Sequence, residues 1–335
     1  MATLVFAAEG DARTGLGHLV RVTGVAGALA GRHEVHLASA SPHRAAVVAE
    51  LAPWATGPVV QHPLPPASAH PWTRGEALAA SLTEIARAVR AAALVLDGRT
   101  AFAPGAFAGA RPETRVIWVD SGAAAPEADD LVVLPTCHAD PTAWPAQIAW
   151  RLRTGPDWTF VHPAVTAAAA RPPQPRAGLF VSMGGSDPNG LTWPAVAHLL
   201  ATRPEPVTAV VGPANAQRRA LEALAADTPR LRLVCGSPAV QDALAGSAWA
   251  LCAFGISAYE AVRLGVPVAV IQHEGGVGGD LDRFAAAFPG RVQRCASWRE
   301  AVVDPTPVGG PVAALGGLAA SLGREIEGWQ TSLGG

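Results

Sequence analysis

The sequence predicts a two-domain α/β protein with a parallel sheet in each domain, and three observations lead to this. The chain of 335 residues exceeds the size at which one hydrophobic core usually suffices. Short apolar runs alternate with stretches of helical periodicity, which is the pattern of βαβ units and parallel strands. This alternation stops at a proline-rich segment and then starts again. We expect the first domain over residues 1–160, a linker over 161–177, the second domain over 178–310 and a C-terminal helix in 311–335. The sequence leaves open whether this helix packs back on the first domain.

The first domain begins with a buried strand and a glycine-rich turn. Apolar residues then recur at three and four positions from Leu19 to Leu29, as on an amphipathic helix, and again from Leu78 to Val89. We expect strands over residues 3–8, 34–38, 94–97, 115–120 and 130–134. Residues 52–73, rich in Pro, Ala and His, predict an irregular connection.

The linker is predicted from its prolines, which remove backbone donors and favour extended conformations. After it, we expect strands over residues 178–183, 207–212, 231–235, 248–254 and 266–271, a helix over 214–226, and helical character in 311–329.

Composition excludes several classes of protein. The net charge is −2 and the arginines are evenly scattered, so a nucleic-acid partner is not expected. No apolar run approaches the roughly 20 residues of a membrane span, and no basic segment precedes the N-terminal apolar run, which argues against a signal peptide. We therefore expect a soluble cytoplasmic protein, a monomer or weak dimer. The chain contains no lysine, which excludes lysine-based mechanisms.

Three glycine-rich turns each follow an expected strand and precede an expected helix. In an open parallel sheet, ligands bind beyond the carboxyl ends of the strands, where helix N-termini offer N–H groups to phosphate. In the first turn, Gly15 and Gly17 allow the backbone to approach a ligand and place His18 in the first turn of the helix, with Arg13 before it and Arg21 after it. The alternative is a tight turn whose histidine only caps the helix or packs locally.

The second and third turns lie in the second domain. Ser182, Gly184, Gly185 and Ser186 could form a nest of N–H donors for a diphosphate, or an ordinary turn. At the third turn a helix begins whose N-terminus could hold phosphate. One helical turn later, a carboxylate could accept hydrogen bonds from two ribose hydroxyls. The residues of this third turn are Gly255, Ile256, Ser257 and Glu260. A capping box between Ser257 and Glu260 is locally as good an interpretation.

The order of these motifs resembles a known family. The segments that carry the resemblance are residues 11–21, 155–158 (Gly-Pro-Asp-Trp), 182–188, 211–213 and 255–267. Together they are similar to the PseG/SpsG family of UDP-sugar hydrolases and spore-coat polysaccharide proteins, over nearly the whole chain. The resemblance implies the GT-B fold of glycosyltransferases such as MurG, in which two Rossmann-like domains with parallel sheets face a central cleft.

The resemblance also implies roles for single residues. His18 matches the histidine that activates water, Glu260 the acid that holds the ribose, and the turns at Gly184–Gly185 and Gly255–Ser257 the pyrophosphate side of a UDP site. It implies neither a metal nor another cofactor.

Two segments depart from the family pattern, both on its sugar side. Asp97–Gly98–Arg99 stands where Asp-His-Tyr is usual, and His273–Glu274–Gly275–Gly276 where Glu-Asn-Gln is usual. Asp97, Arg99, His273 and Glu274 are thus candidate substrate contacts, although a surface histidine beside a glycine-rich loop is also an ordinary feature.

Three functions stay open. The first is a hydrolase that releases UDP from a UDP-linked amino or deoxy sugar, in nonulosonic-acid or surface polysaccharide biosynthesis, with His18 as general base and Arg13 or Arg21 stabilising the leaving diphosphate. The second is a glycosyltransferase with the same donor site. The third is a nucleotide-sugar-binding protein without turnover.

Overall fold

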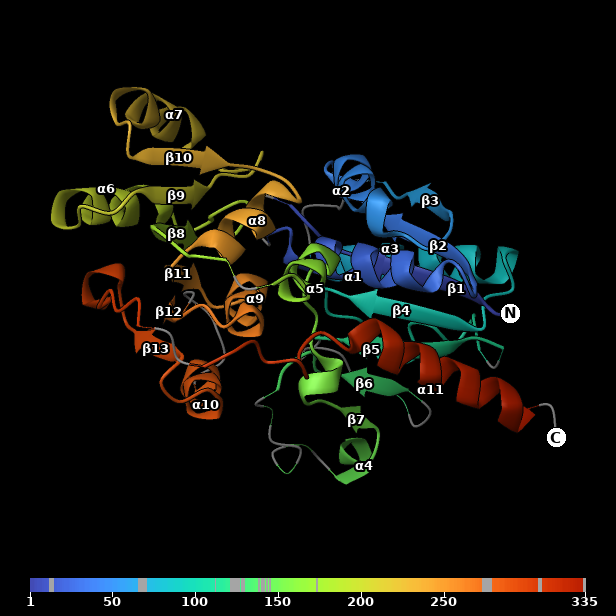
Figure 1. Ribbon diagram of the computed structural model, residues 1–335. Coiled ribbons are helices and arrows are strands. Elements are labelled where there is room, and N and C mark those ends of the chain that lie inside the picture. The colour runs from blue at the N-terminus through green and yellow to red at the C-terminus, as the bar shows by residue number, and fades with distance from the viewer. Residues whose placement is uncertain are drawn as a thin grey trace. The chain divides into compact units, whose positions relative to one another are not determined.

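The fold is taken from a computed structural model of the chain. It describes residues 1–11, 15–65, 71–111, 113–120, 127, 130–137, 139, 142, 144, 146–172, 174–272, 279–306 and 309–333. The chain divides into two compact units (Figure 1). Unit 1 comprises Met1–Gly10, His18–Phe160 and Gly317–Gly335, and unit 2 comprises Asp11–Gly17 and Val161–Gly316.

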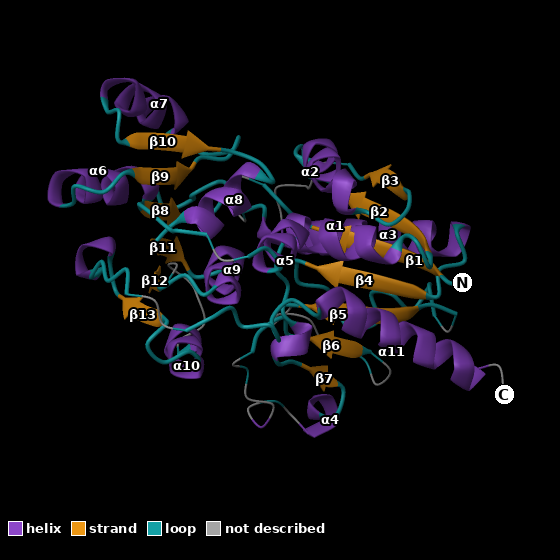
Figure 2. Ribbon diagram, viewed as in Figure 1, coloured by secondary structure: helices purple, strands orange, loops and turns teal. Residues whose placement is uncertain are grey.

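Unit 1 contains a seven-stranded parallel sheet in the order β3-β2-β1-β4-β5-β6-β7 (Figure 2). The strands are β1 (Thr3–Ala8), β2 (Glu34–Ser39), β3 (Val59–Pro63), β4 (Ala93–Asp97), β5 (Arg115–Val119), β6 (Leu131–Val133) and β7 (Leu152–Arg153). The helices are α1 (Gly17–Leu29), α2 (Arg44–Leu51), η1 (Ala52–Trp54), α3 (Pro71–Ala88), α4 (Ala146–Ala149), η3 (Pro156–Trp158) and α11 (Leu318–Leu333). The order reverses between β1 and β4, which makes this a doubly wound, Rossmann-like sheet.

The last helix belongs to unit 1. In α11, the amide of Leu318 donates to the carbonyl of Thr159 (3.1 Å), and Ser321 Oγ donates to the carbonyl of Asp157 (2.8 Å). The guanidinium of Arg115, on β5, stacks over the ring of Trp329. The C-terminal helix thus packs on the unit formed by the N-terminal part of the chain.

Unit 2 repeats the architecture with a six-stranded parallel sheet in the order β10-β9-β8-β11-β12-β13. The strands are β8 (Leu179–Ser182), β9 (Val207–Val210), β10 (Leu231–Val234), β11 (Trp249–Ala253), β12 (Val268–Ile271) and β13 (Val292–Cys295). The helices are α5 (Pro163–Ala169), α6 (Thr192–Thr202), α7 (Arg218–Asp227), α8 (Ala239–Gly246), α9 (Ile256–Leu264), α10 (Asp280–Ala287) and η4 (Trp298–Glu300). The expectation of two Rossmann-like domains with parallel sheets is confirmed.

The structure corrects two local expectations. Residues 52–73 are not an irregular connection, because they include η1, β3 and the start of α3. The expected extended linker contains helix α5: Pro163 occupies its first turn, where a missing N–H costs nothing, and His162 Nδ1 caps it by accepting from the amide of Ala164. Within the described residues, no helix has the length and apolar character that crossing a membrane requires.

Candidate functional site

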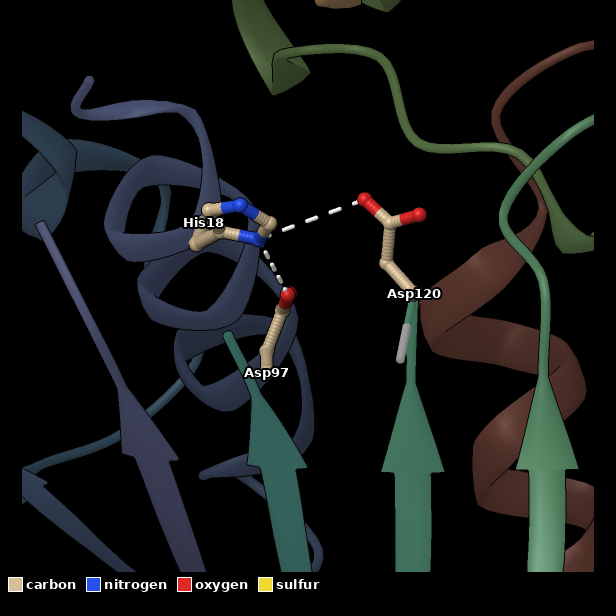
Figure 3. Close-up of side chains that lie close together, drawn as sticks. All are labelled: His18, Asp97 and Asp120. Atoms are coloured by element: carbon tan, nitrogen blue, oxygen red, sulfur yellow. Dashed lines mark hydrogen bonds and ion pairs between the residues drawn. The ribbon is translucent and has the colours of Figure 1, made fainter. Parts of the chain in front are cut away.

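Three polar side chains gather where the strand order of unit 1 reverses. His18 lies in the first turn of α1, just after β1, Asp97 is the last residue of β4, and Asp120 follows the last residue of β5. In doubly wound sheets this reversal leaves a crevice beyond the carboxyl ends of the strands, which is where ligands bind. The sequence separates these residues widely, and the sheet topology brings them together (Figure 3).

His18 and Asp97 form a buried pair. Nδ1 of His18 lies 2.7 Å from Oδ1 of Asp97, and the Asp97 side chain has no exposed surface. Because the ionised carboxylate can only accept, the proton between these atoms is on Nδ1. In the neutral imidazole, Nε2 then carries the lone pair, and Figure 3 shows it directed away from both carboxylates. This arrangement leaves the lone pair of Nε2 available to accept a proton.

Arg21, one helical turn after His18, balances the charge of the two carboxylates. Its Nε donates to Asp97 Oδ2 (2.7 Å), and its Nη2 donates to Asp97 Oδ1 (2.8 Å) and to Asp120 Oδ2 (2.7 Å). Nη2 also lies 3.1 Å from His18 Nδ1. The guanidinium is buried, so these contacts are only weakly screened by solvent.

The pKa values of this group follow from burial and from these contacts. For Asp97, burial alone would raise the pKa, but the charge and hydrogen bonds of Arg21, and then those of His18, outweigh it and hold the pKa below its ordinary value. For Arg21, burial would lower the pKa, but the charges of Asp97 and Asp120 raise it above its ordinary value. Both groups are therefore ionised at neutral pH.

The same atoms form a candidate metal site. One ligand atom each from His18, Asp97 and Asp120 lies within 4.8 Å of the other two. Arg21 Nη2 already contacts all three of these atoms at 3.1 Å or less. The cation of the cluster is therefore a guanidinium, and a metal ion would have to displace it.

Asp120 is the member of this group that the sequence did not single out. Its backbone is left-handed (φ 56°), an unusual conformation that Asp tolerates better than most residues. Its side chain is 39% exposed, whereas that of Asp97 is fully buried. Asp120 can thus hold Arg21 with one oxygen and face a ligand with the other. The signal in the sequence was an Asp at the end of an expected strand, but its neighbour on the sheet could not be known.

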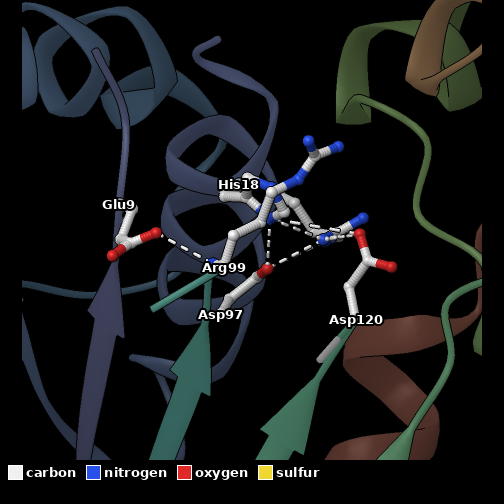
Figure 4. A network of polar contacts seen from close by, with 6 residues as sticks. Glu9, His18, Asp97, Arg99 and Asp120 are labelled. Atoms are coloured by element: carbon white, nitrogen blue, oxygen red, sulfur yellow. Dashed lines mark hydrogen bonds and ion pairs between the residues drawn. The ribbon is translucent and has the colours of Figure 1, made fainter. Parts of the chain in front are cut away.

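The loop after β4 is fixed by Glu9, which follows β1 (Figure 4). Glu9 Oε2 accepts from the amide of Arg99 (2.8 Å), and Oε1 accepts from Thr100 Oγ1. Gly98 leaves room for this contact, because a Cβ there would lie 2.8 Å from Glu9 Cγ. The Arg99 side chain is exposed and forms no ion pair with any described residue.

Unit 2 has a comparable position between β8 and β11, where its strand order reverses. Ser182 ends β8, and its Oγ lies 3.2 Å from Oγ of Ser257 in the first turn of α9. Helix α9 has Gly255 as its N-cap and no side-chain cap, and the amides of Ile256 and Ser257 donate to no described residue. This helix end can therefore donate N–H groups to an anion.

The second glycine-rich turn is built differently. Gly184 has a φ of +85°, and a Cβ there would meet nothing within 4 Å. The N-terminus of α6 is closed, because Asp187 accepts from the amides of Leu191 (2.9 Å) and Thr192 (2.7 Å). The hydroxyl of Ser186 is buried and has no hydrogen-bond partner in the described part of the chain. A phosphate at this turn would thus use the loop rather than the α6 helix end.

Glu260 is buried in α9, with 3% of its surface exposed. Its Oε1 accepts from the backbone amide of His162 (3.0 Å). The capping box that was the alternative interpretation of Ser257 and Glu260 does not form, because the N-cap of α9 is Gly255, two residues before Ser257. Burial raises the pKa of Glu260 to about 7, and the hydrogen bond from His162 lowers it in part.

The other predicted residues fall into three groups. Gly15, with a φ of +82°, lies in the turn before α1, Gly17 is the first residue of α1, and Gly185 lies in the loop after β8. Three predicted residues are outside the described part of the chain: Arg13, His273 and Glu274. Asp97 and Arg21, expected among the substrate contacts, are buried and form an ion pair with each other.

Comparison with known proteins gives structural likeness only. No family model and no curated protein sequence matches the chain. Among solved structures, S. aureus MnaA with UDP has a TM-score of 0.60 at 12% identity, covering 99% of this chain and 97% of that one. The UDP-GlcNAc 2-epimerase of Methanocaldococcus jannaschii with UDP-GlcNAc and UDP gives 0.57 at 10%, covering 97% and 99%. The glycosyltransferase VinC with dTDP gives 0.52 at 15%, covering 97% and 95%. These likenesses show that the chain has the GT-B type of fold, with two Rossmann-like domains.

Proposed function

We propose that the protein binds a UDP-linked sugar and hydrolyses it to UDP and the free sugar, as its resemblance to the PseG/SpsG family implies. The observation that carries this proposal is the pairing of His18 with Asp97 at the carboxyl edge of the unit 1 sheet. His18 Nε2 takes a proton from water, the water oxygen bonds to the sugar carbon, and UDP leaves with the electron pair of the bond that breaks.

The nucleotide half of the proposal rests on unit 2. The uncapped N-terminus of α9 and the buried hydroxyl of Ser186 would donate to the diphosphate. Glu260 would accept the ribose hydroxyls with Oε2, which accepts from no described residue. The printed names of the similar structures mention UDP, UDP-GlcNAc and dTDP, which supports a nucleotide-sugar ligand for this fold.

The test is incubation with a panel of UDP-sugars and no acceptor, with free UDP measured by mass spectrometry. We expect UDP release, and a loss of about 100-fold or more in His18→Ala, the contribution of general-base assistance. His43→Ala is the matched control, since His43 belongs to the same unit and its side chain does not cap α2. Undiminished turnover in His18→Ala would exclude the assigned base.

The same assay separates the other functions. Consumption only after an acceptor is added would indicate glycosyl transfer, the activity in the printed name of VinC. Conversion of the UDP-sugar to a product of the same mass and altered stereochemistry would indicate epimerisation. Binding of the UDP-sugar without any chemical change would indicate a non-catalytic protein. Any of these outcomes would contradict the hydrolase.

A further inference from the structure

Arg99 differs from the other arginine beside His18. Arg21 gives its Nε and Nη2 donors to Asp97 and Asp120, so its charge is neutralised within unit 1. The Arg99 guanidinium is exposed and has no ion-pair partner among the residues that the structure describes. Figure 4 shows it extending beyond the carboxyl ends of the strands, away from Glu9, Asp97 and Asp120.

The backbone of Arg99 is held while its side chain is not. Glu9 binds the amide of Arg99 and the hydroxyl of Thr100, which ties the loop after β4 to the end of β1. The glycine at 98 permits this contact, because a Cβ there would meet the Glu9 side chain. A fixed backbone reduces the entropy that is lost when the guanidinium binds a ligand. The loop thus presents one uncommitted cation, two residues beyond Asp97.

We propose that Arg99 binds a carboxylate carried by the sugar, so that the substrate is a UDP-linked sugar acid. This inference rests on the proposed function, in which the reacting sugar carbon lies at His18. His18 and Arg99 both belong to unit 1 and lie beyond the carboxyl ends of neighbouring strands, so a group on the sugar can reach the loop after β4 (Figure 4). The planar guanidinium matches a carboxylate through two parallel N–H donors, a fit that a hydroxyl cannot reproduce.

The test compares binding of UDP-glucuronate, UDP-glucose and UDP by calorimetry, in the wild type, Arg99→Gln and Arg99→Lys. In the wild type we expect UDP-glucuronate to bind about 10- to 100-fold more tightly than UDP-glucose, the range for a hydrogen bond to a charged group. Arg99→Gln should reduce this ratio to about one and leave the affinity for UDP unchanged. Arg99→Lys should keep the charge but lose part of the ratio.

Two further variants sharpen the result. Glu9→Ala keeps Arg99 but releases its loop, so it should lower the ratio without changing UDP affinity. Arg232→Gln removes an exposed arginine from the edge strand β10 and should change neither the ratio nor the affinity for UDP.

Three outcomes would contradict the proposal. If the wild type bound UDP-glucuronate and UDP-glucose with equal affinity, the role of Arg99 would be overturned, but the nucleotide-sugar site would not. If Arg99→Gln weakened the binding of UDP and of UDP-glucuronate equally, the role of Arg99 as a carboxylate contact would also be overturned, because the guanidinium would then bind the diphosphate. Absence of binding by all three ligands, UDP included, would overturn both proposals.

Discussion

Nδ1 of His18 lies 2.7 Å from Oδ1 of Asp97, an oxygen that also accepts from Arg21 Nη2 at 2.8 Å. The carboxylate therefore fixes two things at once: which nitrogen of the imidazole carries the proton, and where the neighbouring positive charge sits. All three side chains are buried. In the proposed function, a base oriented in this way needs no rearrangement when the reaction begins.

Asp97→Asn should damage both activity and stability. An amide in place of the carboxylate can present its N–H to Nδ1, which favours the wrong tautomer, so UDP release should fall by on the order of 10³- to 10⁴-fold. The unfolding free energy should drop by about 3 kcal/mol, the lower end for a broken buried ion pair, because Asp120 still faces Arg21. Chemical denaturation at neutral pH measures this drop.

The control for Asp97→Asn is Asp242→Asn. Asp242 pairs with Arg171, and their side chains are 48% and 59% exposed, so the loss should stay within about 1 kcal/mol. The pKa of Asp97 is lower in the folded state than in the unfolded chain, so its contribution is complete above the ordinary Asp pKa and is lost as the pH falls towards the folded value. A stability difference between wild type and Asp97→Asn that does not shrink in acid would contradict this account.

Arg21→Met should turn the cluster into a metal site. Without the guanidinium, two carboxylates and an imidazole face one another with ligand atoms within 4.8 Å, and this variant should be less stable than the wild type in buffer with a chelator. Addition of Mn²⁺ or Zn²⁺ should raise its Tm, and metal at about 100 times its Kd would add about 2.7 kcal/mol. The wild type should show no such shift, because Arg21 already occupies this position.

A second substitution tests whether the metal-dependent rise in Tm comes from metal bound at His18, Asp97 and Asp120. Arg21→Met combined with Asp120→Asn removes one metal ligand, while Asn tolerates the left-handed backbone at this position. The metal-dependent rise in Tm should then be much smaller. An equal rise in the single and double variants would place the metal elsewhere.

The strands that the sequence did not reveal all lie at sheet edges. β1, in the middle of its sheet, is buried along nearly its whole length and was predicted at Thr3–Ala8, the bounds that the structure has. β3, β7 and β13 were not predicted, and each lies at the edge of a sheet, whereas the fourth edge strand, β10, was predicted at residues 231–235. β3 and β13 have exposed or half-buried residues along most of their length, so neither shows a buried apolar run, and β3 ends in Pro63, which an edge tolerates.

The candidate site was only partly predictable for a related reason. His18 and Arg21 are three residues apart on one helix, so their neighbourhood was visible in the sequence. Their partners come from β4 and from the end of β5, and these elements become neighbours only through the strand order. Arg21 was therefore expected on the diphosphate, because nothing local showed that two carboxylates would take its donors.

Gly184→Ala tests the backbone of the second glycine-rich turn. Gly184 has a φ of +85° with open space around it, so an added methyl group meets no neighbour and only the backbone conformation resists it. We expect a loss of about 1 kcal/mol of stability and weaker UDP binding, because alanine disfavours the left-handed region. Gly246→Ala is the matched control: its Cβ would also meet nothing, but its φ is not positive. Equal effects in the two variants would show that the conformation of Gly184 is not required.

Glu260→Gln should make the protein more stable at alkaline pH. The pKa of Glu260 is about 7 in the folded state against an ordinary value of 4.5, so the folded state holds a proton that the unfolded chain has released between these values. Stability contributed by this group therefore falls as the pH rises through that window, by about 3 kcal/mol in total, and stays low above it. Glutamine has no proton to lose, and its carbonyl oxygen can still accept from His162.

The measurement is the difference in unfolding free energy between Glu260→Gln and wild type from pH 5 to pH 8, because other groups also titrate in the folded state. His162, whose pKa burial lowers to about 4, acts in the opposite direction and cancels in this difference. Glu222→Gln is the control, since the Glu222 side chain is 51% exposed and pairs with Arg218 on the surface of α7. The difference should rise with pH for Glu260→Gln and stay flat for Glu222→Gln. A difference that does not change with pH for either variant would mean that the Glu260 carboxyl is ionised in the folded protein well below pH 7. Water would then reach this carboxyl despite its burial.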